Sequence, residues 1–248
     1  MRPTVQPTAC VMIIGNEILS GKTQDANLQF FGIELAKLGI QLAEARVVRD
    51  DRTMIVAQLN ECRAKYTYVF TTGGIGPTHD DITAECVAQA FGVPLELDED
   101  AAARLRRGRA DLNQARLKMA HVPVGAILID NPISNAPGFR IGNVFVFAGI
   151  PAIARAMFAA STPQLHAGAQ ILSAALDVYA REGDLAEPLE RIALAHPEVE
   201  IGSYPFARDG RFGAALVVRG IERAAVERVI GEVATAMEAL GGSPVRTS

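Results

Sequence analysis

Acidic residues stand beside glycine-rich loops in this sequence, a combination suited to holding a phosphorylated ligand and a divalent cation. Asp80 and Asp81 directly follow the glycine run 73–78, and Glu85 lies four residues after Asp81. Asp50 closes an earlier apolar run. Neighbouring carboxylates near a glycine turn can hold a cation that bridges phosphate groups. We therefore expect the ligands of a divalent metal ion to come from Asp50, Asp80, Asp81 and Glu85.

Each acid also has a purely structural alternative. Acids at the start of a helix cap its free N–H groups and complement its dipole. Capping accounts well for one acid in the segment 80–85 and poorly for three, so we assign a functional role to Asp81 and leave both roles open for Asp80 and Glu85. For Asp50, capping of the next helix is the favoured interpretation. In a parallel sheet, however, Asp50 and Asp81 could meet at one ion.

Four loops that carry glycine follow apolar runs. Backbone at glycine can approach a ligand closely, and a helix N-terminus offers free N–H groups to an anion. The run 73–78 matches neither the Walker loop nor the dinucleotide motif; its N–H groups would cradle a phosphate or a pterin ring, or it is simply a tight turn. The ligand-binding residues predicted from these loops are Gly15, Glu17, Gly73, Gly74, Gly76, Pro77, Thr78, His79, Ser134, Asn135, Gly138, Gly149 and Pro151.

An α/β fold would bring these loops to one edge. Apolar runs typical of strands alternate with amphipathic helical patterns as far as about residue 160, which favours a mostly parallel sheet covered on both faces. Strands are expected at 11–14, 42–48, 68–72 and 144–148, and helices near 28–38, 54–59, 82–91, 98–109 and 151–160. The carboxyl ends of parallel strands share an edge, and ligands of open α/β sheets bind there.

The pattern changes in the segment 161–168, where we predict a domain boundary between 1–163 and 164–248. Strands are expected at 171–179, 199–206, 212–219 and 244–246, and helices at 185–195 and 224–240. This order is typical of a small split βαβ sandwich, an α+β subdomain. We expect it to serve as an interface or a lid.

Composition limits the classes of partner. The chain has 248 residues and a net charge of −4, which argues against binding to nucleic acid or to an anionic membrane. No apolar run approaches the roughly 18 residues of a membrane span, and a cytoplasmic protein is expected. The three cysteines form no C-x-x-C pattern, so we expect neither a disulfide framework nor a zinc site, and place all three in the core.

Several segments together resemble one known family. They are 14–21 (Ile-Gly-Asn-Glu-Ile-Leu-Ser-Gly), Thr23-x-x-x-Asn27, Val47-Val48-x-Asp50, 72–83 (Thr-Gly-Gly-Ile-Gly-Pro-Thr-x-Asp-Asp-x-Thr), 135–139 (Asn-Ala-Pro-Gly-Phe) and Gly149-Ile150-Pro151. They are similar to the molybdopterin-binding-like domain family, which includes the N-terminal domain of CinA and the MogA and MoaB proteins. The likeness is greatest to the N-terminal domain of eukaryotic-type FAD synthase. It covers most of residues 8–160, and 201–205 resembles that protein's tail.

The resemblance implies a three-layer α/β/α sandwich with a mixed sheet, and it adds Asn27 and Thr72 to the expected ligand-binding residues. It implies that Asp50 and Asp81 serve catalysis and that Mg, Mn or Co is the cofactor. The implied reaction is hydrolysis of the pyrophosphate bond of a nucleotide such as ADP-ribose or FAD, by a homo-oligomer. The alternatives are a non-catalytic pterin- or nucleotide-binding module, and adenylylation of molybdopterin.

Two departures from the family limit what the resemblance implies. CinA carries a deamidase domain and FAD synthase a synthetase domain, for which this sequence leaves no room, so neither activity is expected. CinA also has Gly-Pro-Pro where this sequence has Gly149-Ile150-Pro151.

Overall fold

The computed structural model describes residues 6–108, 113–208 and 210–247. The chain forms two compact units, Met1–Gly168 and Ala169–Ser248, which we call unit 1 and unit 2. Each has buried apolar clusters of its own. The described part of the chain contains no helix long and apolar enough to cross a membrane.

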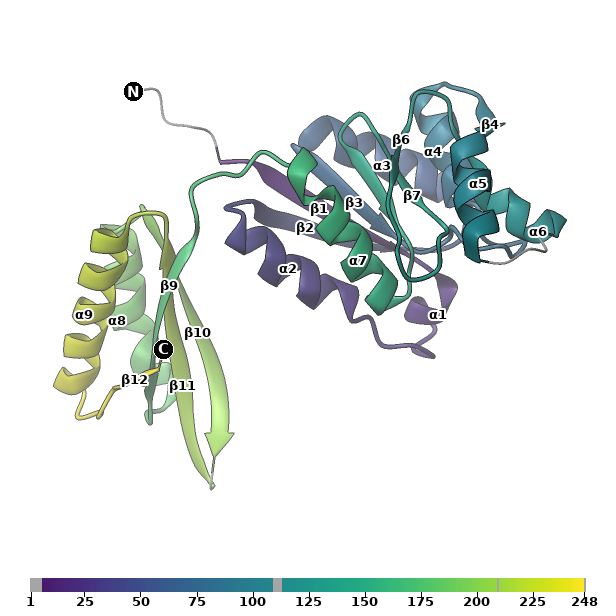
Figure 1. The fold of residues 1–248 in the computed structure, drawn as a ribbon. Helices are drawn as coiled ribbons and strands as arrows, with labels where there is room; N and C mark the ends of the chain where they lie inside the picture. The colour runs from purple at the N-terminus through teal and green to yellow at the C-terminus, as the bar shows by residue number, and fades with distance from the viewer. Residues whose placement is uncertain (1–5, 109–112, 209, 248) are drawn as a thin grey trace. The chain divides into compact units, whose positions relative to one another are not determined.

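A six-stranded sheet forms the centre of unit 1, in the order β2-β1-β3-β8-β7-β6 (Figure 1). Its strands are β1 (Thr8–Ile14), β2 (Gln41–Val48), β3 (Tyr68–Thr72), β6 (Ile127–Ile129), β7 (Gly138–Ile141) and β8 (Val144–Phe147). Strands β2, β1, β3 and β8 are parallel to one another, whereas β7 is antiparallel to both β8 and β6. The sheet is therefore mixed and mostly parallel, as predicted. β7 was not predicted.

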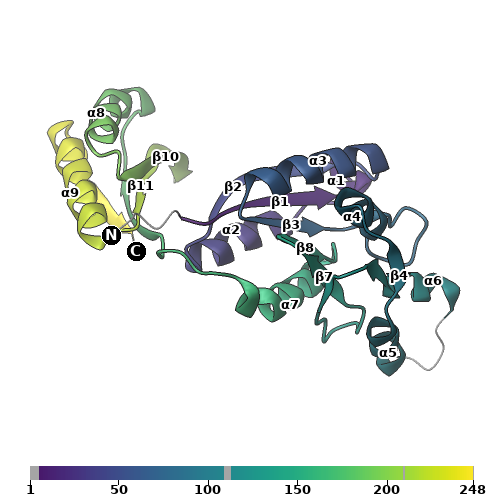
Figure 2. The same ribbon diagram turned by 90° about the horizontal axis from the view of Figure 1, so that it is seen from above.

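Helices cover both faces of this sheet and make three layers (Figures 1 and 2). One face carries α2 (Asn27–Lys37) and α7 (Pro151–Ser161), and the other carries α3 (Arg52–Lys65) and α4 (Thr83–Phe91). The first face is rich in aromatic side chains. Phe31 of α2 is fully buried and stacks on Phe70 of β3, with ring centroids 5.5 Å apart. Side chains alternate across each strand, so neighbouring positions of the central strands fill both interfaces.

A small second sheet in unit 1 brings residues 118–121 close to the glycine run 73–78, which we call the glycine turn. Strands β4 (Leu95–Leu97) and β5 (His121–Pro123) pair antiparallel in a separate two-stranded sheet. The connection between them contains α5 (Glu99–Gly108), α6 (Gln114–Leu117) and the short 3₁₀ helix η1 (Lys118–Ala120). The helix predicted at 98–109 thus corresponds to α5, and residue 109 lies outside the described residues. The remaining short helices of unit 1 are α1 (Asn16–Leu19) and η2 (Thr162–Gln164).

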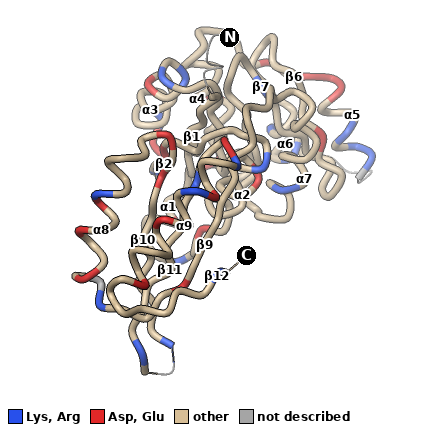
Figure 3. The backbone as a smooth tube through the Cα atoms, turned by 90° about the vertical axis from the view of Figure 1, so that its left-hand side faces the viewer, with Lys and Arg blue, Asp and Glu red and all other residues tan. Residues whose placement is uncertain are grey.

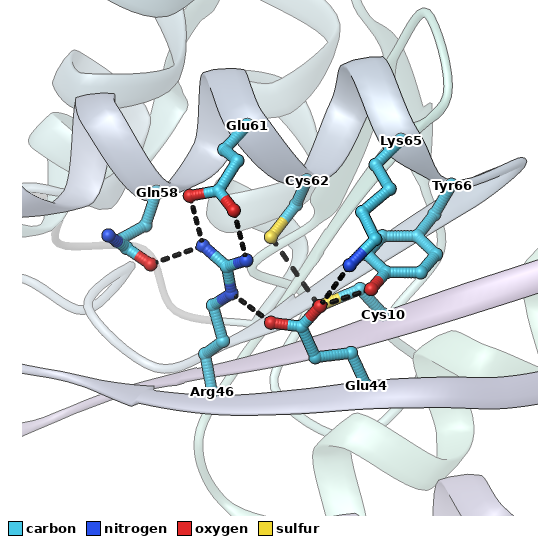
Figure 4. Close-up of polar contacts among 8 residues, drawn as sticks. All are labelled: Cys10, Glu44, Arg46, Gln58, Glu61, Cys62, Lys65 and Tyr66. Atoms are coloured by element: carbon cyan, nitrogen blue, oxygen red, sulfur yellow. Dashed lines mark hydrogen bonds and ion pairs between the residues drawn. The ribbon is translucent and has the colours of Figure 1, made fainter.

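A polar network joins β2 to α3 (Figure 4). The Arg46 guanidinium donates two hydrogen bonds to Glu61, at 2.7 and 2.8 Å, and one to Glu44 at 2.5 Å. Hydrogen bonds from Arg46, Tyr66 and Lys65 hold the pKa of the Glu44 carboxyl down to about 2. Charge-assisted contacts of this kind are stronger than neutral ones. These contacts hold β2, the strand that ends just before Asp50, against α3.

Behind this network the Cys10 and Cys62 thiols lie 3.5 Å apart (Figure 4). All three cysteines are free and buried, as predicted.

Unit 2 is a β-α-β-β-α-β sandwich. Its elements are β9 (Leu172–Val178), α8 (Glu182–Ala195), β10 (Val199–Arg208), β11 (Arg211–Gly220), α9 (Arg223–Ala239) and β12 (Val245–Thr247). The strands form an antiparallel sheet in the order β10-β11-β9-β12. Leu216 and Val218 of β11 pack into one cluster with Val229 of α9. The predicted split βαβ order is confirmed. Figure 3 shows acidic and basic residues interspersed along the chain, with arginines on α5.

Candidate functional site

Three of the predicted loops meet backbone to backbone at the carboxyl edge of the unit 1 sheet. Gly73, directly after β3, has a φ of +98°. A Cβ atom there would lie 2.1 Å from the carbonyl oxygen of Ile14, and one on Gly149 would lie 3.3 Å from the Gly73 Cα. The loops that follow β1, β3 and β8 therefore touch with no side chain between them.

Asn27 ties one of these loops to the start of α2. Its side chain is 3% exposed, and its Nδ2 donates a 2.8 Å hydrogen bond to the carbonyl oxygen of Gly149. Within the described residues, Asn27 Oδ1 and Thr72 Oγ1 are buried and have no hydrogen-bond partner. Because both atoms are buried, Asn27 and Thr72 support the loops from inside the protein and offer no exposed oxygen to a ligand.

The glycine turn after β3 presents free backbone donors. Thr83, the first residue of α4, holds the turn with its N–H on the Gly74 carbonyl at 2.9 Å and its hydroxyl on the Gly73 carbonyl at 3.0 Å. The N–H groups of Gly74, Ile75 and Gly76 donate to no group in the described parts of the chain. Successive free N–H groups of this kind make an anion-binding concavity.

The two aspartates that follow the glycine turn make hydrogen bonds back to Thr78, the last residue of the turn. The N–H of Thr78 donates to Asp81 Oδ2 at 2.8 Å, and the Thr78 hydroxyl lies 2.6 Å from Asp80 Oδ1. This hydroxyl holds the pKa of Asp80 below its ordinary value. The Asp81 carboxylate lies over Gly76, where a Cβ would come within 2.6 Å of it. Ile82 occupies the N-cap of α4 and makes no side-chain cap, so neither aspartate caps that helix.

The favoured capping role of Asp50 is wrong. Asp51, its neighbour, is the N-cap of α3 and accepts a 2.9 Å hydrogen bond from the N–H of Met54. Asp50 Oδ2 instead accepts from the N–H of Asn16 at 2.8 Å. Asp50 therefore ties the end of β2 to the loop after β1, because the chain advances one residue further before α3 begins.

The structure does not gather the four predicted metal-binding acids into a preformed ion site. Across the described ranges, no three His, Cys, Asp or Glu residues lie close enough together to hold an ion. The physical reason is that the acids are already bonded to other groups of the chain, Asp50 to the Asn16 N–H. Glu85 forms an ion pair with Arg52 and lies 4.0 Å from the Lys118 ammonium, while Thr78 contacts both Asp80 and Asp81.

A cavity of about 30 Å³ lies beside the glycine turn, and we call it the turn cavity. Its lining residues are Gly74, Ile75, Gly76, Asp81, Ala84, Glu85, Leu95, Lys118, Met119, His121, Pro137 and Phe139. Lys118 Nζ donates to the carbonyl oxygen of Asp81 at 2.7 Å and to that of Thr78 at 3.1 Å. The turn cavity thus combines free N–H groups, one ammonium and two carboxylates.

Sequence reasoning missed the segment 118–121. Neither Lys118 nor His121 stands in a glycine loop or beside a pair of acids, the two signals on which the predicted site depends. Pairing of β4 with β5 carries this segment to the turn, and strands of three residues leave almost no periodic signal.

The other predicted ligand-binding residues are not among those that line the turn cavity. Asn135, whose φ is +60°, lines a separate hollow of about 500 Å³ with residues of α5 and α7. Ser134 Oγ accepts a 2.6 Å hydrogen bond from Asn131. The His79 side chain is 98% exposed, and the Glu17 carboxylate folds back over Gly15. Gly138 begins β7, and Pro151 is the first residue of α7. Pro77 and Thr78 belong to the glycine turn itself.

Comparison with known proteins identifies both units. Residues 10–167 match the family described as "Probable molybdopterin binding domain", and residues 170–241 match "FAD synthase, middle domain". This chain belongs to the molybdopterin-binding domain family. The family resemblance inferred from the motifs is therefore confirmed, and so is the weaker likeness of the tail.

Its relatives include longer proteins. A CinA-like protein of Gloeobacter violaceus is 32% identical over 252 residues, which are 95% of this chain and 58% of that protein. A probable FAD synthase of Caenorhabditis briggsae is 28% identical over 257 residues, covering 92% of this chain and 49% of that protein.

A solved structure also resembles unit 1 of this family member. The crystal structure of the protein CinA with unknown function from Thermoplasma acidophilum is 36% identical, with a TM-score of 0.60. It covers 64% of this chain and 97% of that one.

Proposed function

We propose that this chain hydrolyses the pyrophosphate bond of a nucleotide such as ADP-ribose or FAD, with help from a divalent cation, at the turn cavity. Membership of the molybdopterin-binding domain family and relatedness to FAD synthase support a phosphorylated ring compound as the ligand class. The observation that carries the proposal is the set of free N–H groups at Gly74, Ile75 and Gly76 beside the Lys118 ammonium. Donors fixed in this way stabilise charge that develops on phosphate oxygens.

The chain's own residues have separate roles in this proposal. The three N–H groups bind non-bridging oxygens of one phosphate. Lys118 holds the turn open through its two carbonyl contacts and adds a positive charge. The Asp81 carboxylate, fixed by the Thr78 N–H, faces the same space and orients the incoming ligand.

The donor set fits a magnesium-type cation only when the ligand is present. Mg²⁺ commonly takes one or two carboxylates and completes its shell with phosphates and waters. Asp81 and Glu85 both line the turn cavity, and we propose that these two would hold the ion. Bound there, the cation would neutralise the pyrophosphate charge.

A second candidate is a binding module without turnover. It is favoured by the engagement of the acids: Asp81 is bonded to Thr78, and Glu85 to Arg52. These bonds would have to open before either carboxylate reached an ion.

The deciding experiment is a metal-by-substrate screen of the purified chain. We expect nucleoside monophosphate to form from ADP-ribose, FAD or NAD with magnesium, manganese or cobalt, and Asp81→Asn to abolish it. Asp98→Asn is the matched control, because Asp98 caps α5 outside the turn cavity. No product with any metal, together with tight calorimetric binding, would establish the binding module instead.

A further inference from the structure

His121 occupies the turn cavity with its protonation pattern fixed by the fold. Its Nδ1 lies 3.2 Å from the carbonyl oxygen of Leu117. A carbonyl oxygen can only accept, so Nδ1 carries the proton and donates it. In neutral imidazole the other nitrogen is then an acceptor. Nε2 therefore holds a free lone pair, and no group in the described parts of the chain bonds to it.

The surroundings of this ring contain polar partners for a small guest. The imidazole lines the turn cavity together with Asp81 and Lys118. A space of about 30 Å³ holds two or three water molecules, since each needs roughly 10–15 Å³. The same space adjoins the free N–H groups of the glycine turn, where a phosphate oxygen would be held. A water molecule here would lie beside both His121 and the glycine turn.

Two of the other histidines do not share this arrangement. His196 has both ring nitrogens near acids, with Nε2 2.8 Å from Glu232 and Nδ1 3.4 Å from Glu198. The His79 side chain is 98% exposed. A ring with one nitrogen held by backbone and the other directed to a ligand is a common design for proton transfer.

We propose that His121 is the proton acceptor of this site, and this rests on the proposed hydrolysis. The oxygen of a water molecule forms a bond to phosphorus, and one water proton moves to His121 Nε2. The bond from that phosphorus to the bridging oxygen breaks, and its electron pair leaves with the departing phosphate. The imidazolium then returns the proton to solvent, which restores the neutral ring.

Two substitutions separate this role from a purely structural one. His121→Asn keeps a donor near the position of Nδ1, within reach of Leu117, and removes the group at Nε2. His121→Gln places an amide near Nε2 and loses the Leu117 bond. If Nε2 accepts the proton, His121→Asn lowers kcat about 10²-fold or more with KM little changed, and His121→Gln loses as much, because no amide is basic enough to take the proton. A purely structural role predicts instead that His121→Asn, which keeps the Leu117 contact, retains more activity than His121→Gln. His196→Gln is the control and leaves kcat unchanged.

Higher activity in His121→Asn than in His121→Gln, or full activity in both variants, would overturn the role of His121 while leaving the proposed hydrolysis in place. Should the wild-type chain turn over no substrate with any metal, the hydrolysis fails, and the role of His121 as proton acceptor falls with it.

Nitrogen-15 NMR of the wild-type chain, with AMP as the probe, needs no variant to fold. We expect the Nδ1–H tautomer in the free protein and a shift of the His121 Nε2 resonance on adding AMP. An Nε2–H tautomer, or a resonance that AMP leaves unmoved, would overturn the inference.

Discussion

Replacing Gly73 by alanine tests how closely the loops at the rim are packed, and Gly92→Ala is its matched control. Both glycines lie in unit 1 with positive φ, +98° and +65°. A Cβ at Gly92, the residue that ends α4, would have no atom within 4 Å. The control therefore carries only the conformational cost of a left-handed alanine, about 1–2 kcal/mol.

Gly73→Ala adds a steric cost to that conformational one. Its Cβ would lie 2.1 Å from the Ile14 carbonyl oxygen, whereas carbon and oxygen normally approach no closer than about 3.3 Å. The end of β1 would have to move by about 1 Å, and β1 is held on both sides by β2 and β3. We expect Gly73→Ala to lower the free energy of unfolding of unit 1 by about 4 kcal/mol or more, in the exceptional class of point mutants.

The assay is thermal unfolding followed by circular dichroism, because the chain contains no tryptophan. A difference of about 3 kcal/mol between the two variants corresponds to roughly 6–12 °C in Tm for a domain of this size. Equal Tm values for Gly73→Ala and Gly92→Ala would refute the reasoning, because the clash with the Ile14 carbonyl exists only at Gly73.

Three further predictions concern the contacts that hold the site. Lys118→Met should cost about 1 kcal/mol, because the carbonyl oxygens of Thr78 and Asp81, one exposed and one part-buried, lose a charged donor; hydrogen exchange of the turn should quicken, and an unchanged rate would contradict the contact. Asp51→Ala should cost about 1 kcal/mol through loss of the α3 cap, measured by urea unfolding, whereas Asp50→Ala should leave the helicity of α3 unchanged. The pKa of the Glu44 carboxyl is held down to about 2, first by the hydrogen bond from Arg46, against an ordinary value of 4.5. The stability that the ionised Glu44 gives to the fold is therefore complete above pH 4.5 and is lost as pH falls toward 2. Glu44→Gln should flatten the decline of Tm in that window, and an identical decline would refute this.

The fold of unit 1 followed closely from periodicity. Apolar runs located β1, β3 and β8, because these strands are buried on both faces and read as continuous apolar segments. The edge strand β2 was located by its alternating pattern instead. β7 was missed because its four residues include Gly138 and Arg140, which interrupt an apolar pattern. β4 and β5 have three residues each, too few to show a period of two.

The site was predictable only where its residues are contiguous. Glycine followed by aspartate in the run 73–81 marked the turn, and the structure places Gly74, Gly76 and Asp81 around one cavity. His121 joins them through strand pairing and a backbone hydrogen bond, neither of which leaves a trace in residue spacing. Asp50 and Asp51 are both acids at a strand end, so composition could not decide which one would cap α3.

Close packing explains the glycines at the rim without reference to any bound ligand. Gly73 is needed because the Ile14 carbonyl occupies the place of its missing side chain, and a Cβ on Gly149 would lie only 3.3 Å from the Gly73 Cα. A descendant that had lost all chemistry would still be obliged to keep Gly73 in order to fold. Its persistence in a genome therefore diagnoses the architecture, whereas the residues of the turn cavity bear on the proposed chemistry.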